Sequence, residues 1–266
     1  MPSLEQIVAG FILAAAIAVA SRSLRFLTPC GSALQFVLGW LLFSLGGLQW
    51  TLPILVFFLS ASILSRTFRH REPAARELFA KHDVRDELQV LANGAVAGLL
   101  VIGWAADRSQ ALYVAYLGAV AAAAADTWGT ELGLLSKSKP RLITNWKPVE
   151  RGTSGGVSGG GSLGGLAGAC LVCLSGLLWV DNDLVPLISA LVGAVAGAAM
   201  DSLLGAACQA HYACTVCGKT TEKRFHCGSP APLLYGKRWV TNDAVNFACT
   251  LTGAVVSWLV FCAISK

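Results

Sequence analysis

The stretch ALYVAYLGAVAAAAADTWGTELGLL, residues 111–135, determines the fold class of this chain. Its first fifteen residues are apolar or small, and its only charged residues are Asp126 and Glu131. A helix needs about 20 apolar residues to cross a hydrocarbon core about 30 Å thick. The stretch therefore predicts a transmembrane helix that carries two carboxylates within an apolar run.

The composition extends this interpretation to the whole chain. Of its 266 residues, 55% are hydrophobic and only 13% are charged, with a mean hydropathy of +0.62. Soluble domains contain about 25% charged residues. Every backbone polar group in a membrane must be hydrogen-bonded internally, and the strand repeats of a barrel are absent. We expect an all-α, polytopic transmembrane helical bundle that forms one integral membrane domain over residues 1–266.

Eight apolar stretches are candidate spans. They are Leu4–Ala20, Ala33–Leu48, Leu52–Ser65, Leu88–Ala106, Ala111–Leu135, Ser162–Val180, Leu184–Ala207 and Ala244–Ile264. The second and third are short for a crossing, so they could tilt, extend further or form one re-entrant pair. About eight spans are expected, and six or seven also fit the pattern.

Basic residues are concentrated in four connections that fall on one side of an eight-span chain. These are Ser21–Ser32, Arg66–Glu87, Ser136–Gly161 and Cys208–Asp243, which contain 18 of the 20 lysine and arginine residues. The other side receives Arg108 and Lys266, together with Asp181 and Asp183. The positive-inside rule places the loops 66–87, 136–161 and 208–243 in the cytoplasm and both termini opposite. Because Arg22 and Arg25 follow the first span, we expect that span to remain uncleaved.

Polar residues inside the predicted spans form the first candidate site. Its carboxylates are Asp126, Glu131, Asp201 and Asp243, and its amides are Asn93, Asn242 and Asn246. Ionisable groups in spans usually face the bundle interior at functional sites, although interhelical hydrogen bonding is the alternative role. Carboxylate oxygens suit Mg²⁺, with Asp126, Asp201 and Asp243 as the expected ligands. Asp126 and Glu131 lie about 140° apart on a regular helix, so both can reach one ion only if Gly129 loosens the backbone.

A glycine-rich loop before the sixth span is the second candidate site. It contains Arg151, Gly152, Thr153, Ser154, Gly155 and Gly156, and it follows the cations Lys137, Lys139, Arg141 and Lys147. Glycine lets successive backbone N–H groups face an anion, and a helix N-terminus adds a favourable dipole. The loop is therefore a candidate phosphate cradle, although it lacks the Gly-Lys-Ser/Thr ending of a Walker A loop. Tight helix packing through four-spaced glycines is the alternative, and the two roles are compatible.

Four side chains in the last loop form a candidate zinc site. They are Cys214, Cys217, His226 and Cys227. A CxxC pair with a downstream His-Cys pair can supply four tetrahedral ligands. The adjacency of His226 and Cys227 is unfavourable for ligation of one ion, so ordinary reduced thiols are the alternative.

Six ordered motifs give this chain a specific resemblance. They are QVLANG (89–94), ADTWGTELG (125–133), SKSKPRLIT (136–144), GTSGGVS (152–158), DSLLGA (201–206) and NDAVN (242–246). The chain resembles the transmembrane protein 19 family, which includes the plant phytyl-phosphate kinases, over nearly its whole length. Ser154 departs from the asparagine that this family pattern leads us to expect there. The resemblance implies transfer of phosphate, with Mg²⁺ and CTP, onto an isoprenoid-lipid monophosphate to give the diphosphate.

The resemblance also suggests roles for the candidate residues. The four carboxylates would orient phosphates and hold Mg²⁺, the asparagines would donate hydrogen bonds, and the glycine-rich loop and its cations would bind phosphate. The partners would be a prenyl or phytyl phosphate, a nucleotide and membrane lipid. We expect no nucleic-acid partner, because the sequence has no basic surface interleaved with aromatic residues. A lipid or small-molecule transporter and a non-catalytic membrane scaffold are the alternatives. We expect a multi-pass protein of the endoplasmic reticulum or plastid envelope in a eukaryote, or of the plasma membrane in a prokaryote.

Overall fold

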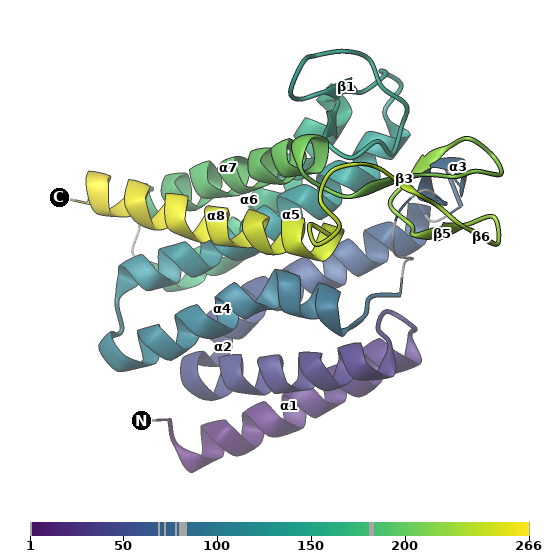
Figure 1. Ribbon diagram of the computed structural model, residues 1–266. Helices are drawn as coiled ribbons and strands as arrows, with labels where there is room; N and C mark the ends of the chain where they lie inside the picture. The colour runs from purple at the N-terminus through teal and green to yellow at the C-terminus, as the bar shows by residue number, and fades with distance from the viewer. Residues whose placement is uncertain are drawn as a thin grey trace.

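The computed structural model describes residues 2–68, 70–71, 73–77, 79, 84–180 and 184–265. Within these residues, seven helices are long and apolar enough to cross a membrane, which confirms the all-α membrane fold. They are α1 (Leu4–Ser23), α2 (Pro29–Phe68), α4 (Glu87–Asp107), α5 (Gln110–Leu135), α6 (Gly159–Gly176, extended by the 3₁₀ turn η1, Leu177–Trp179), α7 (Val185–Ala207) and α8 (Asn242–Ile264). The helices lie side by side as a bundle (Figure 1). Each begins or ends within a few residues of the corresponding predicted span.

Helix α2 reverses direction at Gly47, so its 40 residues form two arms. Gly47 has φ 63° and ψ −152°, a conformation outside the helical region that glycine adopts readily. A straight helix of this length would extend about 60 Å. Instead, the guanidinium of Arg66 near its end donates to the carbonyl of Leu24, just before its beginning, at 3.2 Å. Figure 1 shows the two arms side by side. With the arms counted separately, the described chain has eight apolar helical segments, at the positions predicted.

Short strands occupy the loops at one end of the bundle, a feature that the all-α prediction did not include. In the loop before α6, β1 (Arg141–Leu142) pairs with β2 (Gly156–Val157). In the loop before α8, the strands are β3 (His211–Ala213), β4 (Thr220–Thr221), β5 (Phe225–His226), β6 (Ser229–Pro230) and β7 (Leu233–Tyr235). They form a three-stranded sheet, β4-β3-β7, and a hairpin, β5-β6. Beside them lies the short helix α3 (Pro73–Arg76).

Both termini lie at the end of the bundle opposite these loops (Figure 1). The connections predicted to share one side therefore do lie at one end of the molecule. Their cytoplasmic placement remains a prediction, and Asp181, Asp183 and Lys266 lie outside the described residues.

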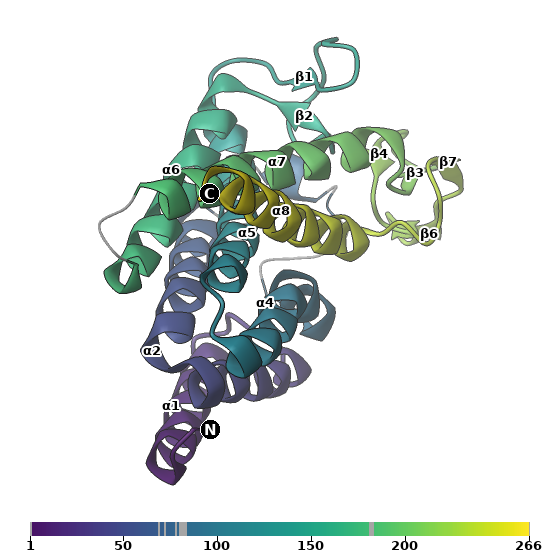
Figure 2. The same cartoon turned by 90° about the vertical axis from the view of Figure 1, so that its left-hand side faces the viewer.

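Helix α5 forms the centre of the bundle, where α2, α4, α6, α7 and α8 pack around it (Figure 2). Every residue from Tyr113 to Ala125 is buried. Small residues allow this close packing: a Cβ added to Gly165 of α6 would lie 2.7 Å from the carbonyl oxygen of Ala125. The predicted carboxylate Asp126 follows directly after this buried run, and so lies deep between helices.

Candidate functional site

A cavity of about 570 Å³ lies at the loop end of the bundle, lined by residues of α2 to α8 and of three loops. Its lining includes most of the residues singled out from the sequence. These are Asn93, Asp126, Glu131, Arg151, Gly152, Thr153, Ser154, Gly155, Gly156, Asp201, Asn242 and Asn246. The cavity is therefore the place where the predicted carboxylates, amides and glycine-rich loop come together.

The carboxyl groups of Asp126 on α5 and Asp201 on α7 lie next to each other in the cavity. Two carboxyl groups this close are stable when they share a proton or when a cation lies between them. The Oδ2 atom of Asp201 is buried and has no hydrogen-bond partner among the described residues. Paired carboxylates with an unsatisfied oxygen fit the ligand set that proteins offer to Mg²⁺.

Glu131 faces a different part of the cavity, where it forms an ion pair with Arg76 of α3. Helix α5 continues without interruption to Leu135, so Gly129 does not loosen the backbone. Instead, Gly129 lets α6 approach: its added Cβ would lie 3.3 Å from the carbonyl of Gly161. Because α5 is a regular helix here, the side chains of Asp126 and Glu131 point about 140° apart around its axis. The two carboxylates therefore do not share one ion.

Arg85 adds a second positive charge near Glu131. Its guanidinium lies 3.4 Å from the hydroxyl of Ser62 and 5.9 Å from the ring centres of Phe57 and Phe58. Burial lowers the pKa of Arg85 to about 10, although the negative charge of Glu131 raises it, so this arginine stays protonated at neutral pH. Arg76 and Arg85 thus bring two positive charges to the part of the cavity lining that holds Glu131.

The glycine-rich loop is held in place by its own hydrogen bonds and by α7. Gly152 and Gly155 have φ of 82° and 77°, the left-handed region that favours glycine. A Cβ on Gly155 would lie 2.6 Å from the carbonyl of Ser202, so this glycine packs against α7. The N–H groups of Thr153 and Gly156 already donate to backbone carbonyls. Any phosphate cradle must therefore use the other N–H groups of the loop and the α6 N-terminus, since Ser158 and Gly161 also line the cavity.

The predicted counter-charges divide into two sets. Arg151 lines the cavity, together with Arg76 and Arg85. Four other cations are exposed and are not among its lining residues: Lys137, Lys139, Arg141 and Lys147. They lie on or beside strand β1, and their side chains face solvent. The guanidinium of Arg141 donates to the carbonyl of Trp146 at 2.9 Å. The structure thus brings Arg76 and Arg85 to the cavity lining, whereas these four loop cations lie outside it.

Asp243 also differs from its predicted position. It is the second residue of α8, and it does not line the cavity, whereas its neighbours Asn242 and Asn246 do. A carboxylate in the first turn of a helix interacts favourably with the helix dipole. The structure therefore places Asp243 in the first turn of α8, outside the lining of the cavity.

Glu222 is a cavity residue that the sequence analysis missed. It comes from the loop before α8 and accepts a hydrogen bond from the hydroxyl of Ser154. Its charge acts on both Asp126 and Asp201. Apart from Asp243 at its end, the loop 208–243 has no other acidic residue. The sequence signal that could have indicated Glu222 is that it is a single carboxylate among the five cations of this loop.

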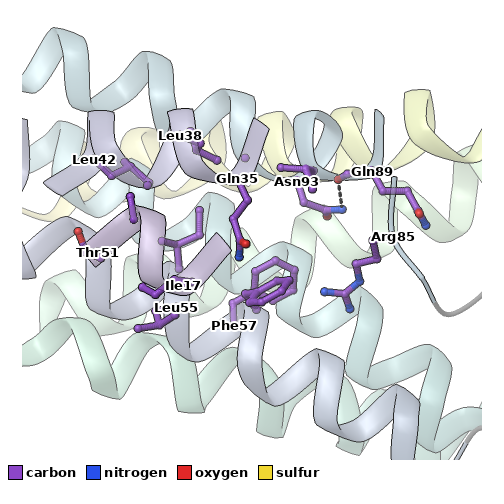
Figure 3. A pocket seen from close by; sticks show the side chains of 16 residues that line it. Ile17, Gln35, Leu38, Leu42, Thr51, Leu55, Phe57, Arg85, Gln89 and Asn93 are labelled. Atoms are coloured by element: carbon purple, nitrogen blue, oxygen red, sulfur yellow. Dashed lines mark hydrogen bonds between the residues drawn. The ribbon is translucent and has the colours of Figure 1, made fainter. Parts of the chain in front are cut away.

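A second, smaller pocket of about 90 Å³ adjoins the cavity (Figure 3). Its walls are apolar side chains of α1, both arms of α2 and α4, such as Ile17, Leu42 and Leu55. Three residues line both spaces: Arg85, Gln89 and Asn93. Gln89 forms a capping box with Asp86 at the start of α4, and the Asn93 amide donates to its carbonyl at 2.9 Å. Polar groups thus mark the boundary between an apolar pocket and a charged cavity.

The four candidate zinc ligands also come together. The ligand atoms of Cys214, Cys217, His226 and Cys227 all lie within 4.8 Å of one another. The loop that carries them also carries Glu222.

Comparison with known proteins assigns the family. A model described as integral membrane protein DUF92 matches residues 12–254, so the chain belongs to this family of integral membrane proteins and is a multi-pass membrane protein. It is similar to protein PGR of Arabidopsis thaliana, with 31% identity over 272 aligned residues that cover 92% of this chain and 93% of that protein. It is also similar to an uncharacterized membrane protein of Methanocaldococcus jannaschii, with 28% identity covering 99% and 98% of the two chains. No solved structure matches the chain.

Proposed function

We propose that this DUF92 family member is a membrane-embedded kinase. It transfers phosphate from a nucleotide, CTP by the resemblance to phytyl-phosphate kinases, to an isoprenoid-lipid monophosphate and produces the diphosphate. One observation supports the proposal: a charged cavity with paired carboxylates adjoins an apolar pocket inside the helical bundle, and Arg85, Gln89 and Asn93 line both spaces. An acceptor with an anionic head and an apolar tail fits this combination.

The acceptor's phosphate is placed at the boundary between the two spaces. Arg85 and Arg76 supply positive charge there, next to the carboxylate of Glu131. Guanidinium groups bind phosphate with charge-assisted and often bidentate hydrogen bonds. The first carbons of the prenyl chain then lie among the apolar side chains of the smaller pocket, and the rest of the tail extends between helices towards lipid.

The nucleotide's phosphates are placed on the other side of the cavity. The glycine-rich loop, Arg151 and the N-terminus of α6 line that side. A helix N-terminus presents N–H groups and a positive dipole to an anion. Asn242 and Asn246 of α8 line the same cavity and can donate hydrogen bonds to phosphate oxygens. The two substrates therefore meet near the Asp126–Asp201 pair.

The transfer requires positioning and charge neutralisation more than an acid or base. An oxygen of the acceptor monophosphate attacks the γ-phosphorus, and a new P–O bond forms. The bond from the γ-phosphorus to the oxygen bridging to the β-phosphate breaks, and the diphosphate nucleotide leaves with the electron pair. Because the second pKa of a phosphate monoester is about 6, the acceptor is already largely a dianion at pH 7.

Asp126 and Asp201 are the residues that would hold Mg²⁺. When bound, the ion would neutralise charge on the phosphates. Arg76, Arg85 and Arg151 hold the reacting groups in place, and Glu222, through Ser154, fixes the glycine-rich loop. The carboxylate pair is half-buried below the loops, which limits the access of bulk water to it.

A nucleotide-consumption assay tests this function. Purified protein is incubated with CTP, Mg²⁺ and prenyl monophosphates of several chain lengths, and free CDP is measured. We expect CDP release that depends on the lipid monophosphate. A transporter would instead move substrate across sealed vesicles without CDP release, so transport without nucleotide consumption would exclude the kinase.

A further inference from the structure

We propose that Cys214, Cys217, His226 and Cys227 bind one structural zinc ion, which fixes Glu222 at the mouth of the cavity. This zinc site is separate from the phosphate chemistry, and it stands whether or not the chain is a kinase. Its ligands come from two turns of one loop, and Glu222 lies between those turns in the sequence.

The distances among the ligand atoms suit a tetrahedral ion. With Zn–S bonds of about 2.3 Å and Zn–N bonds of about 2.0 Å, tetrahedral ligands lie about 3.5–3.8 Å from each other. The Sγ atoms of Cys217 and Cys227 lie 3.5 and 3.3 Å from Nδ1 of His226. All four ligand atoms lie within 4.8 Å of one another. Thiol–imidazole hydrogen bonds account for the two sulfur–nitrogen distances alone, whereas the convergence of all four ligand atoms favours a metal ion.

The first turn is arranged to hold a thiolate. The backbone N–H groups of Val216 and Cys217 point to Sγ of Cys214, at 3.4 and 3.5 Å. Such hydrogen bonds stabilise negative charge on sulfur. Gly218, with φ 71°, then turns the chain back, and its N–H donates to the carbonyl of Cys214 at 3.0 Å. The turn therefore presents the sulfurs of Cys214 and Cys217 on one side.

The second turn explains how adjacent His226 and Cys227 can both reach one ion. Because successive side chains of a strand point to opposite faces, adjacent His226 and Cys227 would not be expected to bind the same ion. However, Cys227 and Gly228 have φ of 52° and 74°, as in the tight two-residue turn that joins β5 to β6. The left-handed conformation of Cys227 brings its sulfur beside the histidine ring. The structure thus corrects the expectation drawn from sequence adjacency.

The outer nitrogen of the histidine lies near a carboxylate, at a distance too long for a hydrogen bond. Its Nδ1 atom faces the cysteines, and its Nε2 atom lies 4.0 Å from a carboxylate oxygen of Glu77. Histidines that bind zinc commonly direct their other nitrogen to a carboxylate, which orients the ring. Glu77 follows Arg76, the partner of Glu131 in the cavity. The zinc site is thereby adjacent to a second segment that lines the cavity.

Zinc binding has a structural consequence for Glu222. The residue follows β4, four residues before His226, and accepts a hydrogen bond from Ser154 of the glycine-rich loop. A loop of such short strands has little apolar core of its own, and a metal can supply folding free energy to such segments. The ion therefore holds the carboxylate of Glu222 against the glycine-rich loop.

Metal analysis of the full-length protein, purified without chelators, tests the proposal. We expect about one zinc per chain, as in four-ligand sites. The double variant Cys214→Ser, Cys217→Ser should lose this zinc, and the control Cys30→Ser, Cys262→Ser should keep it. Glu222→Gln should also keep its zinc, because this residue is not a ligand. Zinc that persists in the Cys214, Cys217 double variant would overturn the assignment.

Cobalt titration of the wild-type protein keeps the test independent of how the variants fold. After zinc is stripped with a chelator, added Co²⁺ should produce the absorption of thiolate–cobalt bonds at one ion per chain, and Zn²⁺ should abolish it. Hydrogen exchange in residues 214–227 should rise on stripping and fall again on adding Zn²⁺. Wild-type protein that contains no zinc and gives no cobalt–thiolate absorption would refute the site, whatever the outcome of the kinase assay.

Discussion

Asp126 on α5 and Asp201 on α7 bring their carboxyl groups into direct contact, beneath a loop that carries a third carboxylate, Glu222. Two helices that need only pack together would gain nothing from such a pair, because like charges at this distance repel. The pair becomes favourable when the two carboxyl groups share a proton or when a cation binds between them. This relationship distinguishes the cavity from an ordinary polar contact within a membrane bundle.

Asp126→Asn and Asp201→Asn should each abolish turnover and leave the protein folded. Loss of a metal ligand removes several kcal/mol of charge stabilisation from the transition state, which corresponds to a rate loss of at least about 10³-fold. The repulsion within the pair is also relieved, so the melting temperature without Mg²⁺ should be unchanged or higher. Thermal unfolding and steady-state kinetics measure both effects.

Asp243→Asn serves as the matched control, because Asp243 lies at the start of α8 and outside the cavity lining. It should lose activity far less than the other two variants. It should also keep the stabilisation that Mg²⁺ gives to the wild type. Equal loss in all three variants would indicate that the carboxylates act through general stability and not as a metal-binding pair.

Gly155→Val should damage the glycine-rich loop. A Cβ at this position would lie 2.5 Å from Cβ of Ala206, and the left-handed φ disfavours a β-branched residue. We expect a stability loss of about 1–3 kcal/mol together with weakened nucleotide binding. Gly159→Ala is the control, since nothing lies within 4 Å of its added Cβ. Denaturation midpoints and nucleotide titrations measure the two effects. Equal stability and equal nucleotide affinity in the two variants would contradict the proposed role of the loop.

Arg85→Gln should raise the KM for the lipid monophosphate by about tenfold or more, since a charge-assisted hydrogen bond contributes about 1.5–3 kcal/mol. Lys139→Gln removes the same charge from an exposed loop position and should have a small effect that fades with added salt. The comparison decides between the cation indicated by the structure and one indicated by the sequence alone. A larger effect at Lys139 would favour the sequence-based assignment.

Leu55→Trp should fill the small apolar pocket. We expect weaker use of prenyl monophosphates, most clearly for long chains, with nucleotide binding unchanged. Leu59→Trp, one turn further along the same arm, is the control because Leu59 is 40% exposed and does not line the pocket. Kinetics over a series of chain lengths measure the effect, and an identical profile for both variants would place the tail elsewhere.

Much of the fold could be predicted from the sequence, because long apolar runs and the charge of their connections are strong signals. The reversal at Gly47 divides α2 into two arms, which correspond to the two short spans predicted there. Nothing in the sequence distinguishes Gly47 from Gly46 beside it, since the turn depends on how the two arms pack. The small strands were missed because segments of two or three residues show no periodicity.

The site was predictable only where polar residues interrupt apolar runs. Asp126 and Asp201 are conspicuous for that reason, and the structure places them together. Glu222 and Arg76 lie in polar loops, where one more charge carries no signal. Conversely, Lys139 and Arg141 seemed suitable because they precede the glycine-rich loop, yet the β1 hairpin holds them on the outside. Proximity in sequence did not indicate proximity in space.

Transfer of the γ-phosphate label of CTP to a prenyl monophosphate tests the central claim most directly. Purified protein in lipid, with Mg²⁺ and γ-labelled CTP, should produce one labelled prenyl diphosphate for each CDP released, and Asp201→Asn should produce none. Label that appears only as inorganic phosphate, or no nucleotide use with any prenyl monophosphate, would contradict the kinase.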